Sequence, residues 1–213
     1  MPVELDVDVE ELFRIVMDDS LWGRPRLDLL YGVSQTRDNE IAVLTKLAAY
    51  QGKIGISGVQ SNALGYPGCA VWARELLNSG VKPGQLVLVE GGLSVQGGVE
   101  VFHTLSEAQA LVAYAKQKGL KTIGVVAPIY HLTRVMMSMV FAVNLTYPTL
   151  RVYPILGEHQ DLNAWVAHSQ GKLQAPRAQL FVSEAARIYR YRAQGNLPSQ
   201  EEFVAYLARR DAA

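Results

Sequence analysis

Short runs of Val, Ile and Leu alternate with amphipathic segments along most of this chain. Runs of this kind that stop at glycine or proline predict buried strands, and apolar residues spaced three and four apart predict helices. Neighbouring parallel strands need a crossover connection, which is usually a helix, whereas antiparallel strands need only a turn. The alternation, which occurs four or five times, therefore predicts a parallel, doubly wound α/β sheet with helices on both faces.

Five strands are expected, each an apolar run bounded by turn residues. They span residues 27–33, 53–57, 85–90, 123–126 and 150–156. The fifth run contains Pro154, which lacks the N–H group that a central strand donates to its neighbour. We therefore expect the fifth strand at an edge of the sheet or at a bulge.

The first helices are predicted from apolar spacing and capping residues. One over residues 7–18 is expected to pack on the sheet. Asp38 or Asn39 is expected to cap a second helix over residues 40–51. The apolar face of the second helix is expected to consist of Ile41, Leu44, Leu47 and Ala48.

Later helices follow the same signals. Pro67 is expected in the first turn of a helix that ends near Ser79. Thr104 or Ser106 is expected to cap a helix that stops at Gly119, and a further helix follows Pro128. Between residues 93 and 103, two alternating segments flank Gly97-Gly98, which predicts either a small β-hairpin or a flexible lid.

The chain is expected to form a single domain over residues 1–213, with its core in residues 27–156. A C-terminal helical extension is expected over residues 176–210, with its last helix opened by Ser199. The apolar flank of this extension is expected to cover the sheet or a second subunit, so a homodimer is one alternative.

Composition and charge argue against several classes of protein. Lys and Arg number 20, as do Asp and Glu, so no overall field favours a nucleic acid as partner. The single cysteine, Cys69, excludes an internal disulfide framework. The first residues lack the order of a signal peptide, and the longest apolar stretch, residues 135–143, is too short to span a membrane. We therefore expect a cytoplasmic protein.

The strongest candidate site is the turn after the fourth strand, which carries His131 and Arg134. Residues three apart lie on one helical face, and the free N–H groups of a helix's first turn favour an anion. A neutral imidazole can move a proton near pH 7, and a guanidinium can bind phosphate or carboxylate. The alternative is an ordinary helix start in which Arg134 pairs with a carboxylate of the fold.

Glu90 ends the third strand and is expected beside the same crevice, because open α/β sheets bind ligands at the carboxyl ends of their strands. There it could orient His131, act as a base or bind a ribose hydroxyl. Alternatively, Glu90 pairs with Arg134 or with a loop donor. Gly58, Gly91 and Gly92 could let backbone approach a phosphate or could be ordinary turn residues.

Three weaker candidates keep both a functional and a structural interpretation. Cys69 could be a nucleophile in a helix's first turn or a small core residue. His103 could transfer a proton or cap a helix. The mixed basic and aromatic run from Arg187 to Arg192 could contact nucleic acid, but in a neutral protein it is better explained as a solvated face. No local spacing of ligands predicts a metal site.

Four motifs occur in a set order along residues 27–151. They are Ile56-Ser57-Gly58, then Gly80-Val81 before Glu90, then Thr104 with Ala108, and finally Tyr130-His131-Leu132-Thr133-Arg134, the most specific. This order resembles the YdcF/ElyC/SanA family, a bacterial group that contains a domain of unknown function. The resemblance implies a three-layer, Rossmann-like fold with a ligand site at the carboxyl ends of the strands. Some branches of this family carry a membrane anchor and are linked to envelope or lipid-carrier metabolism.

The chain also departs from the family pattern near the expected site. His103 and Ser106 stand where the family usually has Asn and Glu. Pro67 to Ala70 replaces a Ser-Glu-Ala-like helix start, and the stretch between Glu90 and Thr104 is longer than usual. The ligand and chemistry could therefore differ from those of any relative.

From these residues we expect a small anionic ligand that is nucleotide-like or phosphorylated, with a nucleotide or S-adenosylmethionine as candidate cofactor. Arg134 would anchor the anion, and His131 and Glu90 would be catalytic if the protein is a hydrolase or group transferase. The other expected ligand-binding residues are Ser57, Gly58, Gly91, Gly92, His103, Thr104 and Tyr130. A non-catalytic binding or regulatory module linked to envelope metabolism is the alternative, and a purely structural or interaction protein is a third.

Overall fold

The structure, a computed structural model, describes residues 11–14, 16, 26–60, 66–96, 99–168 and 173–212. Its centre is a sheet of five parallel strands in the order β3-β2-β1-β6-β7. These strands are β1 (Leu29–Gly32), β2 (Ile54–Ser57), β3 (Leu86–Val89), β6 (Thr122–Ala127) and β7 (Arg151–Leu156). The predicted parallel sheet is thus confirmed, and β7, which contains Pro154, lies at an edge as expected.

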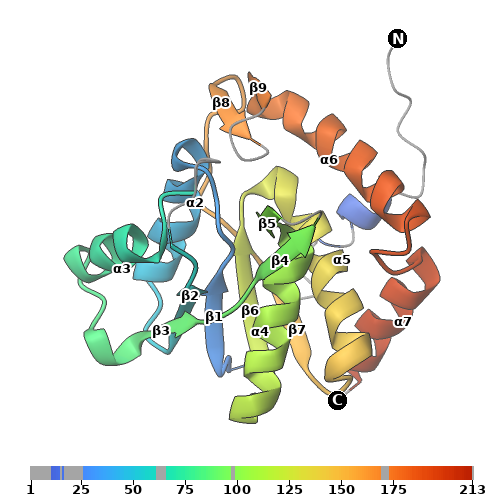
Figure 1. The fold of residues 1–213 in the computed structure, drawn as a ribbon, viewed down its shortest axis with the longest axis horizontal. Helices are drawn as coiled ribbons and strands as arrows, with labels where there is room; N and C mark the ends of the chain where they lie inside the picture. Colours follow the sequence, from blue (N-terminus) through green and yellow to red (C-terminus); the bar gives the residue numbers. More distant parts are fainter. Residues whose placement is uncertain are drawn as a thin grey trace.

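Helices cover both faces of this sheet (Figure 1). Successive strand side chains point to opposite faces, so Leu29 and Tyr31 of β1 enter one core cluster while Leu30 enters the other. The cluster around Leu30 includes residues of α2 (Arg37–Ala48) and α3 (Cys69–Asn78). The cluster around Leu29 and Tyr31 includes residues of α4 (Thr104–Lys118) and α5 (Ile129–Thr146). This arrangement is the expected three-layer α/β fold.

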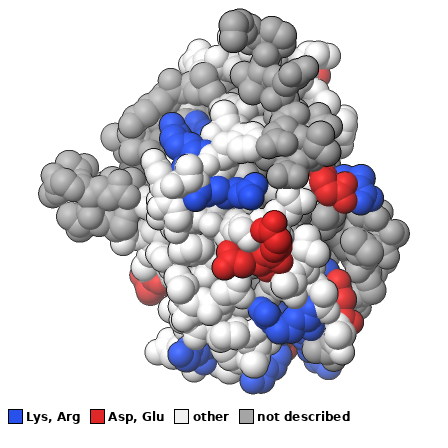
Figure 2. All heavy atoms as spheres, turned by 90° about the vertical axis from the view of Figure 1, so that its right-hand side faces the viewer, with Lys and Arg blue, Asp and Glu red and all other residues white. Residues whose placement is uncertain are grey.

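The two predicted C-terminal helices are present as α6 (Arg177–Ala193) and α7 (Gln200–Asp211). Both pack on the α5 side of the sheet, where Ile188 and Phe203 join the core cluster. Ser199 caps α7 as expected, because its hydroxyl accepts a hydrogen bond from the Glu202 N–H. Figure 2 shows the surface on this side of the molecule, where basic and acidic side chains lie interspersed.

The start of α2 differs from the sequence prediction. The N-cap is Thr36, and the predicted caps, Asp38 and Asn39, lie inside the first turn. The predicted apolar face is also partly wrong, because Ile41 is 63% exposed while Val43 is buried. Glu40 is buried instead, where its carboxylate accepts a hydrogen bond from the Trp72 indole.

Two other helix starts also differ from expectation. Helix α3 begins at Cys69 after Gly68, whose φ of 97° favours glycine, so Pro67 precedes the helix. Helix α4 is capped by His103, whose Nδ1 accepts a hydrogen bond from the Ser106 N–H. Its predicted end is confirmed, since Gly119 has a φ of 67°.

Two hairpins flank the sheet. The first pairs β4 (Leu93–Gln96) with β5 (Val99–Phe102), which confirms the hairpin alternative, although Gly97-Gly98 lies outside the described residues. The second pairs β8 (Trp165–His168) with β9 (Leu173–Pro176). The second hairpin was not predicted, and it precedes α6 directly.

The remaining elements are short. A 3-10 helix, η2, spans Pro83–Gln85. Of the predicted N-terminal helix, residues 11–14 and 16 are helical and the rest lie outside the described residues. Leu12, Phe13 and Val16 are buried in the α5-side core, as the amphipathic pattern predicts. Within the described part of the chain, no helix has the length and apolar character needed to cross a membrane.

Candidate functional site

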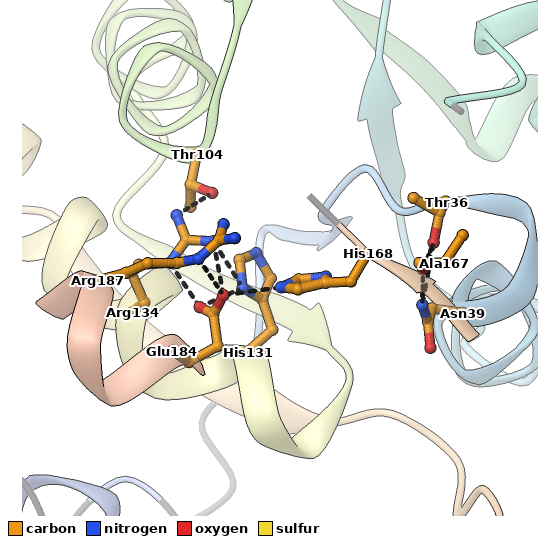
Figure 3. Close-up of polar contacts among 9 residues, drawn as sticks. All are labelled: Thr36, Asn39, Thr104, His131, Arg134, Ala167, His168, Glu184 and Arg187. Atoms are coloured by element: carbon orange, nitrogen blue, oxygen red, sulfur yellow. Dashed lines mark hydrogen bonds and ion pairs between the residues drawn. The ribbon is translucent and has the colours of Figure 1, made fainter. Parts of the chain in front are cut away.

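The turn between β6 and α5 places His131 and Arg134 together, as the sequence predicts. Pro128 is the N-cap of α5, so both residues lie within the first two turns and point to the same side of the helix (Figure 3). Both side chains are buried, with exposed fractions of 4% and 6%. Burial of two such polar groups requires partners, and those partners define the site.

The partner of both residues is Glu184, a fully buried carboxylate on α6. Its Oε2 lies 3.0 Å from Nδ1 of His131 and accepts a hydrogen bond from Nε of Arg134. Its Oε1 accepts from Nη2 of Arg134 at 3.2 Å and lies 2.9 Å from Nε2 of His168. Arg187 adds an ion pair with the same oxygen. Figure 3 shows these side chains converging from α5, α6 and the second hairpin.

The sequence analysis missed Glu184, although a signal for it exists. Leu180, Glu184 and Ile188 are spaced four apart and lie on the buried stripe of α6. A carboxylate in the middle of an apolar stripe requires a buried cation or donor. The guanidinium of Arg134 and the imidazole of His131 outweigh the cost of desolvation, so they hold the pKa of Glu184 well below its usual value.

His131 is a neutral imidazole at neutral pH. Burial, with a further contribution from the positive charge of Arg134, lowers its pKa to about 4. Its Nδ1 lies 3.0 Å from Oε2 of the ionised Glu184 and 3.1 Å from Nη2 of Arg134, which can only donate and which already donates to Oε1 of Glu184. An unprotonated Nδ1 would set its lone pair against that of the carboxylate, and these two lone pairs would repel each other. We therefore assign the proton to Nδ1, which donates it to Glu184. This tautomer leaves Nε2 as a hydrogen-bond acceptor, and Nε2 has no partner among the described residues.

Arg134 contacts several other side chains. Besides its bonds to Glu184, its Nη1 donates to Oγ1 of Thr104 at 2.8 Å, and its guanidinium carbon lies 5.9 Å from the centre of the Tyr191 ring. This geometry matches the alternative in which Arg134 pairs with a carboxylate of the fold. An anion at this site would therefore meet a guanidinium that Glu184 already orients and partly neutralises.

The second hairpin supplies His168, which sequence reasoning also missed. Its neighbour Ala167 ties the hairpin to the start of α2: the carbonyl accepts from Thr36 Oγ1 and Asn39 Nδ2, and the N–H donates to Asp38. These contacts lie beside the carboxyl end of β1 (Figure 3). His168 follows no regular pattern in the sequence, so only the tertiary structure identifies it.

Tyr130 lies beside this cluster. Its ring makes an edge contact with the His168 ring at 5.3 Å between centroids. Its hydroxyl is buried without a hydrogen-bond partner among the described residues, and burial raises its pKa. An orphaned buried hydroxyl is costly, so it is a candidate donor to a ligand.

The structure does not bring Glu90 to His131. Glu90 follows β3 at the far edge of the sheet, where it is exposed, and β2 and β1 separate it from β6. Three strand spacings amount to about 14 Å. Glycine at position 58 leaves room for the Glu90 carboxylate, because a Cβ at this position would lie only 2.9 Å from Oε2 of Glu90. Ser57 is also at this edge, where its hydroxyl accepts from the Val59 N–H.

The remaining predicted ligand residues, Gly91, Gly92 and His103, lie near the N-terminal part of α4. Gly91 and Gly92 have φ values of 97° and 91°, so both occupy conformations that favour glycine. The Gly92 carbonyl accepts a hydrogen bond from the Ser106 hydroxyl. His103 is half-buried as the cap of α4, and burial, with Arg134 nearby, lowers its pKa. The capping interpretation of His103 is therefore the one that the geometry supports.

Cys69 is not brought to His131 either. It is buried at the start of α3, which covers the opposite face of the sheet from α5. Its Sγ accepts a hydrogen bond from Nε2 of Gln60 at 3.3 Å. Among the described residues, no three His, Cys, Asp or Glu side chains are placed to hold a metal ion.

Comparison with known proteins adds no relative to this picture. No model of a protein family matches the sequence, and no curated protein matches it. The resemblance to the YdcF/ElyC/SanA family therefore stays a prediction from the motifs.

Proposed function

We propose that this chain is a YdcF/ElyC/SanA-like protein that binds a small anionic ligand, nucleotide-like or phosphorylated, at the carboxyl ends of its strands. The observation that carries the proposal is the convergence of Arg134, His131, His168 and Arg187 on the single carboxylate of Glu184. With His131 neutral, two guanidinium groups face one carboxylate. The cluster is therefore positive, which favours an anion.

The position of this cluster supports the same conclusion. It lies at the start of α5, whose first-turn N–H groups point toward the carboxyl end of β6. The strand order β3-β2-β1-β6-β7 reverses direction between β1 and β6, and open α/β sheets bind ligands at such a switch point. Ser57, Gly58 and Glu90 lie two and three strands away, so only an elongated ligand would reach both ends.

If the protein is an enzyme, hydrolysis or group transfer at a phosphate or activated ester suits these residues best. Glu184 fixes the imidazole of His131 through Nδ1, as an orienting carboxylate does in many acid–base sites. The free Nε2 would then accept a proton from water or from a ligand hydroxyl. Arg134 would stabilise negative charge that develops on the ligand.

A non-catalytic binding or regulatory module is the second candidate, and the burial of the cluster favours it. An imidazole with a pKa of about 4 is a weak base at neutral pH. Arg134 is also held by Glu184 and Thr104 rather than left open. In this alternative, the site would sense an anionic metabolite of the cell envelope without converting it.

A thermal-shift screen tests binding directly, because a ligand that binds only the native state raises its stability. The probes are AMP, ATP, S-adenosylmethionine, glucose 6-phosphate and a short polyprenyl phosphate. We expect at least one anionic probe to raise the melting temperature of the wild-type protein. If no probe does so at millimolar concentration, the proposed function is wrong.

The Tyr130→Phe variant localises that binding with little risk to the fold. Its hydroxyl has no hydrogen-bond partner to lose in the part of the chain that the structure describes, so its removal should leave the melting temperature of the free protein nearly unchanged. We expect several-fold weaker probe binding. The control is Arg209→Gln on the exposed surface of α7, which should bind as the wild type does. A second variant, His131→Gln, separates the two candidate functions. If the wild type converts a bound probe and His131→Gln binds the probe without converting it, the protein is an enzyme and not a sensor.

A further inference from the structure

Another buried carboxylate, Glu107, lies in the first turn of α4 and faces the carboxyl end of β1. Its exposed fraction is 5%. Its Oε1 accepts three hydrogen bonds, from the Tyr31 hydroxyl and from both the N–H and the hydroxyl of Ser34, each at 2.9 Å. These bonds fix the carboxylate in one orientation at the point where β1 ends.

The other oxygen of this carboxylate, Oε2, has no hydrogen-bond partner among the described residues. No Lys, Arg or His side chain of the described part of the chain pairs with Glu107 either. The groups that face it, Tyr31, Ser34 and Tyr66, are uncharged. A buried carboxylate usually has a cation or a full set of donors, so this one has unused capacity to accept hydrogen bonds.

Glu107 is close to the cluster around Glu184. Thr104 and Glu107 are three apart on α4, so their side chains lie on one helical face. Both border one small pocket, whose other lining residues, such as Val135, are mostly apolar. Thr104 is also the residue that accepts a hydrogen bond from Arg134 (Figure 3). Thr104 therefore links the two groups, because it bonds Arg134 and precedes Glu107 by one helical turn, while Glu107 itself binds Tyr31 and Ser34 at the carboxyl end of β1.

We propose that Glu107 is a specificity residue of the anion site, whose Oε2 accepts a hydrogen bond from a hydroxyl group of the bound phosphorylated compound. This inference rests on the proposed function, because it needs an anion held near Arg134 and His131. It adds that the ligand carries a hydroxyl group beside its phosphate, as sugar phosphates and nucleotides do. A carboxylate accepts from a hydroxyl more strongly than a neutral acceptor does.

The competing interpretation is that Glu107 only ties α4 to β1. The Glu107→Gln variant separates the two, because the amide oxygen can still accept the three bonds from Tyr31 and Ser34. The amide nitrogen that replaces Oε2 can only donate. Glu40→Gln is the matched control, since Glu40 is another buried carboxyl but is held by Trp72 of α3 and Arg37 of α2.

The experiment measures binding of inorganic phosphate, ribose 5-phosphate and AMP to the wild type and both variants by calorimetric titration at pH 7.5. We expect the wild type to bind ribose 5-phosphate or AMP more tightly than phosphate. In Glu107→Gln, we expect phosphate affinity to stay within about twofold and the affinity for the hydroxylated probe to fall about tenfold. Glu40→Gln should match the wild type for all three probes.

Two results would overturn this inference while leaving the proposed function intact. One is a Glu107→Gln variant that binds every probe as the wild type does, which would make Glu107 a structural tie. The other is a wild type that binds phosphate as tightly as the hydroxylated probes. If the wild type binds none of the three probes, the anion site itself fails, and the inference about Glu107 fails with it.

Discussion

Nδ1 of His131 lies 3.0 Å from Oε2 of Glu184, although 53 residues separate them in the chain. The carboxylate is fully buried and the imidazole is 4% exposed. Water therefore screens their interaction only weakly. The same carboxylate binds Arg134 through Nε and Nη2, so the orientation of both predicted site residues depends on α6.

Removal of the charge on Glu184 should destabilise the protein strongly. In Glu184→Gln, the guanidinium of Arg134 would stay buried without its counter-ion, which costs about 3–5 kcal/mol. Lys46→Gln is the control, because Lys46 forms an exposed ion pair with Glu158 at 3.8 Å and should change stability by less than about 1 kcal/mol. Urea denaturation of both variants measures the difference. Equal stability of the two variants would contradict the assigned role of Glu184.

His131 should make the protein less stable in acid. The folded pKa of about 4 lies below the ordinary value of 6.5, so the unfolded chain binds a proton that the folded protein rejects. This contribution is fully present above pH 6.5 and is lost as the pH falls toward 4. It amounts to roughly 3 kcal/mol. In His131→Gln, the free energy of unfolding should therefore fall less than in the wild type between pH 7.5 and pH 4. Urea denaturation across this pH range measures the difference. An equal fall in both proteins would contradict the prediction.

Glu107 should act in the opposite direction. Burial raises its pKa to about 7 from an ordinary 4.5, so the folded protein binds a proton that the unfolded chain releases. Its contribution is present below pH 4.5 and is lost as the pH rises to about 7, by roughly 3 kcal/mol. Between pH 4.5 and 7, the free energy of unfolding of Glu107→Gln should therefore decline less than that of the wild type, as urea denaturation would measure.

Glu40 provides an internal comparison for that measurement. Burial raises its pKa to about 7 as well, so Glu40→Gln should also remove part of the decline between pH 4.5 and 7. The two residues share no described contact, so the double variant should show the sum of the two effects. A decline in Glu107→Gln as steep as that in the wild type would show that Glu107 titrates normally.

Arg177 should hold the second hairpin in place. Its guanidinium donates to Asn39 Oδ1 and to the backbone carbonyls of Asp38 and Asp161. Arg177→Met keeps the apolar stem but leaves these acceptors unpaired, so we expect a loss of about 1–3 kcal/mol. Hydrogen exchange should become faster in β8 and β9. Exchange in β1 and β6 should not change, and equal acceleration throughout the sheet would contradict a local role.

The sheet was predictable because each strand carries its own signal. Apolar runs such as Ile123 to Val126 are buried on both faces, and Pro154 marks an edge because proline cannot donate to a neighbouring strand. The face of α2 was not predictable from its period alone. Glu40 turns inward because the indole of Trp72 on α3 donates to it, and Ile41 is exposed as a result.

The site was predictable only in part, for a similar reason. His131 and Arg134 are neighbours on one helix, so their spacing shows that they share a face. Glu184 and His168 come from later segments, and only the packing of α6 and the second hairpin brings them to α5. The expectation that Glu90 lies beside His131 relied on a common sheet edge. Strand order, which a single sequence does not reveal, places Glu90 three strands away.

The most direct test of this account is a pH titration of the His131 ring nitrogens by NMR in the free protein. We predict that at neutral pH the proton is on Nδ1, that Nε2 is unprotonated, and that the ring becomes cationic only near pH 4. A proton on Nε2 at neutral pH, or a ring that titrates near its ordinary value of 6.5, would contradict the account. Either result would mean that Glu184 does not orient His131 toward a ligand.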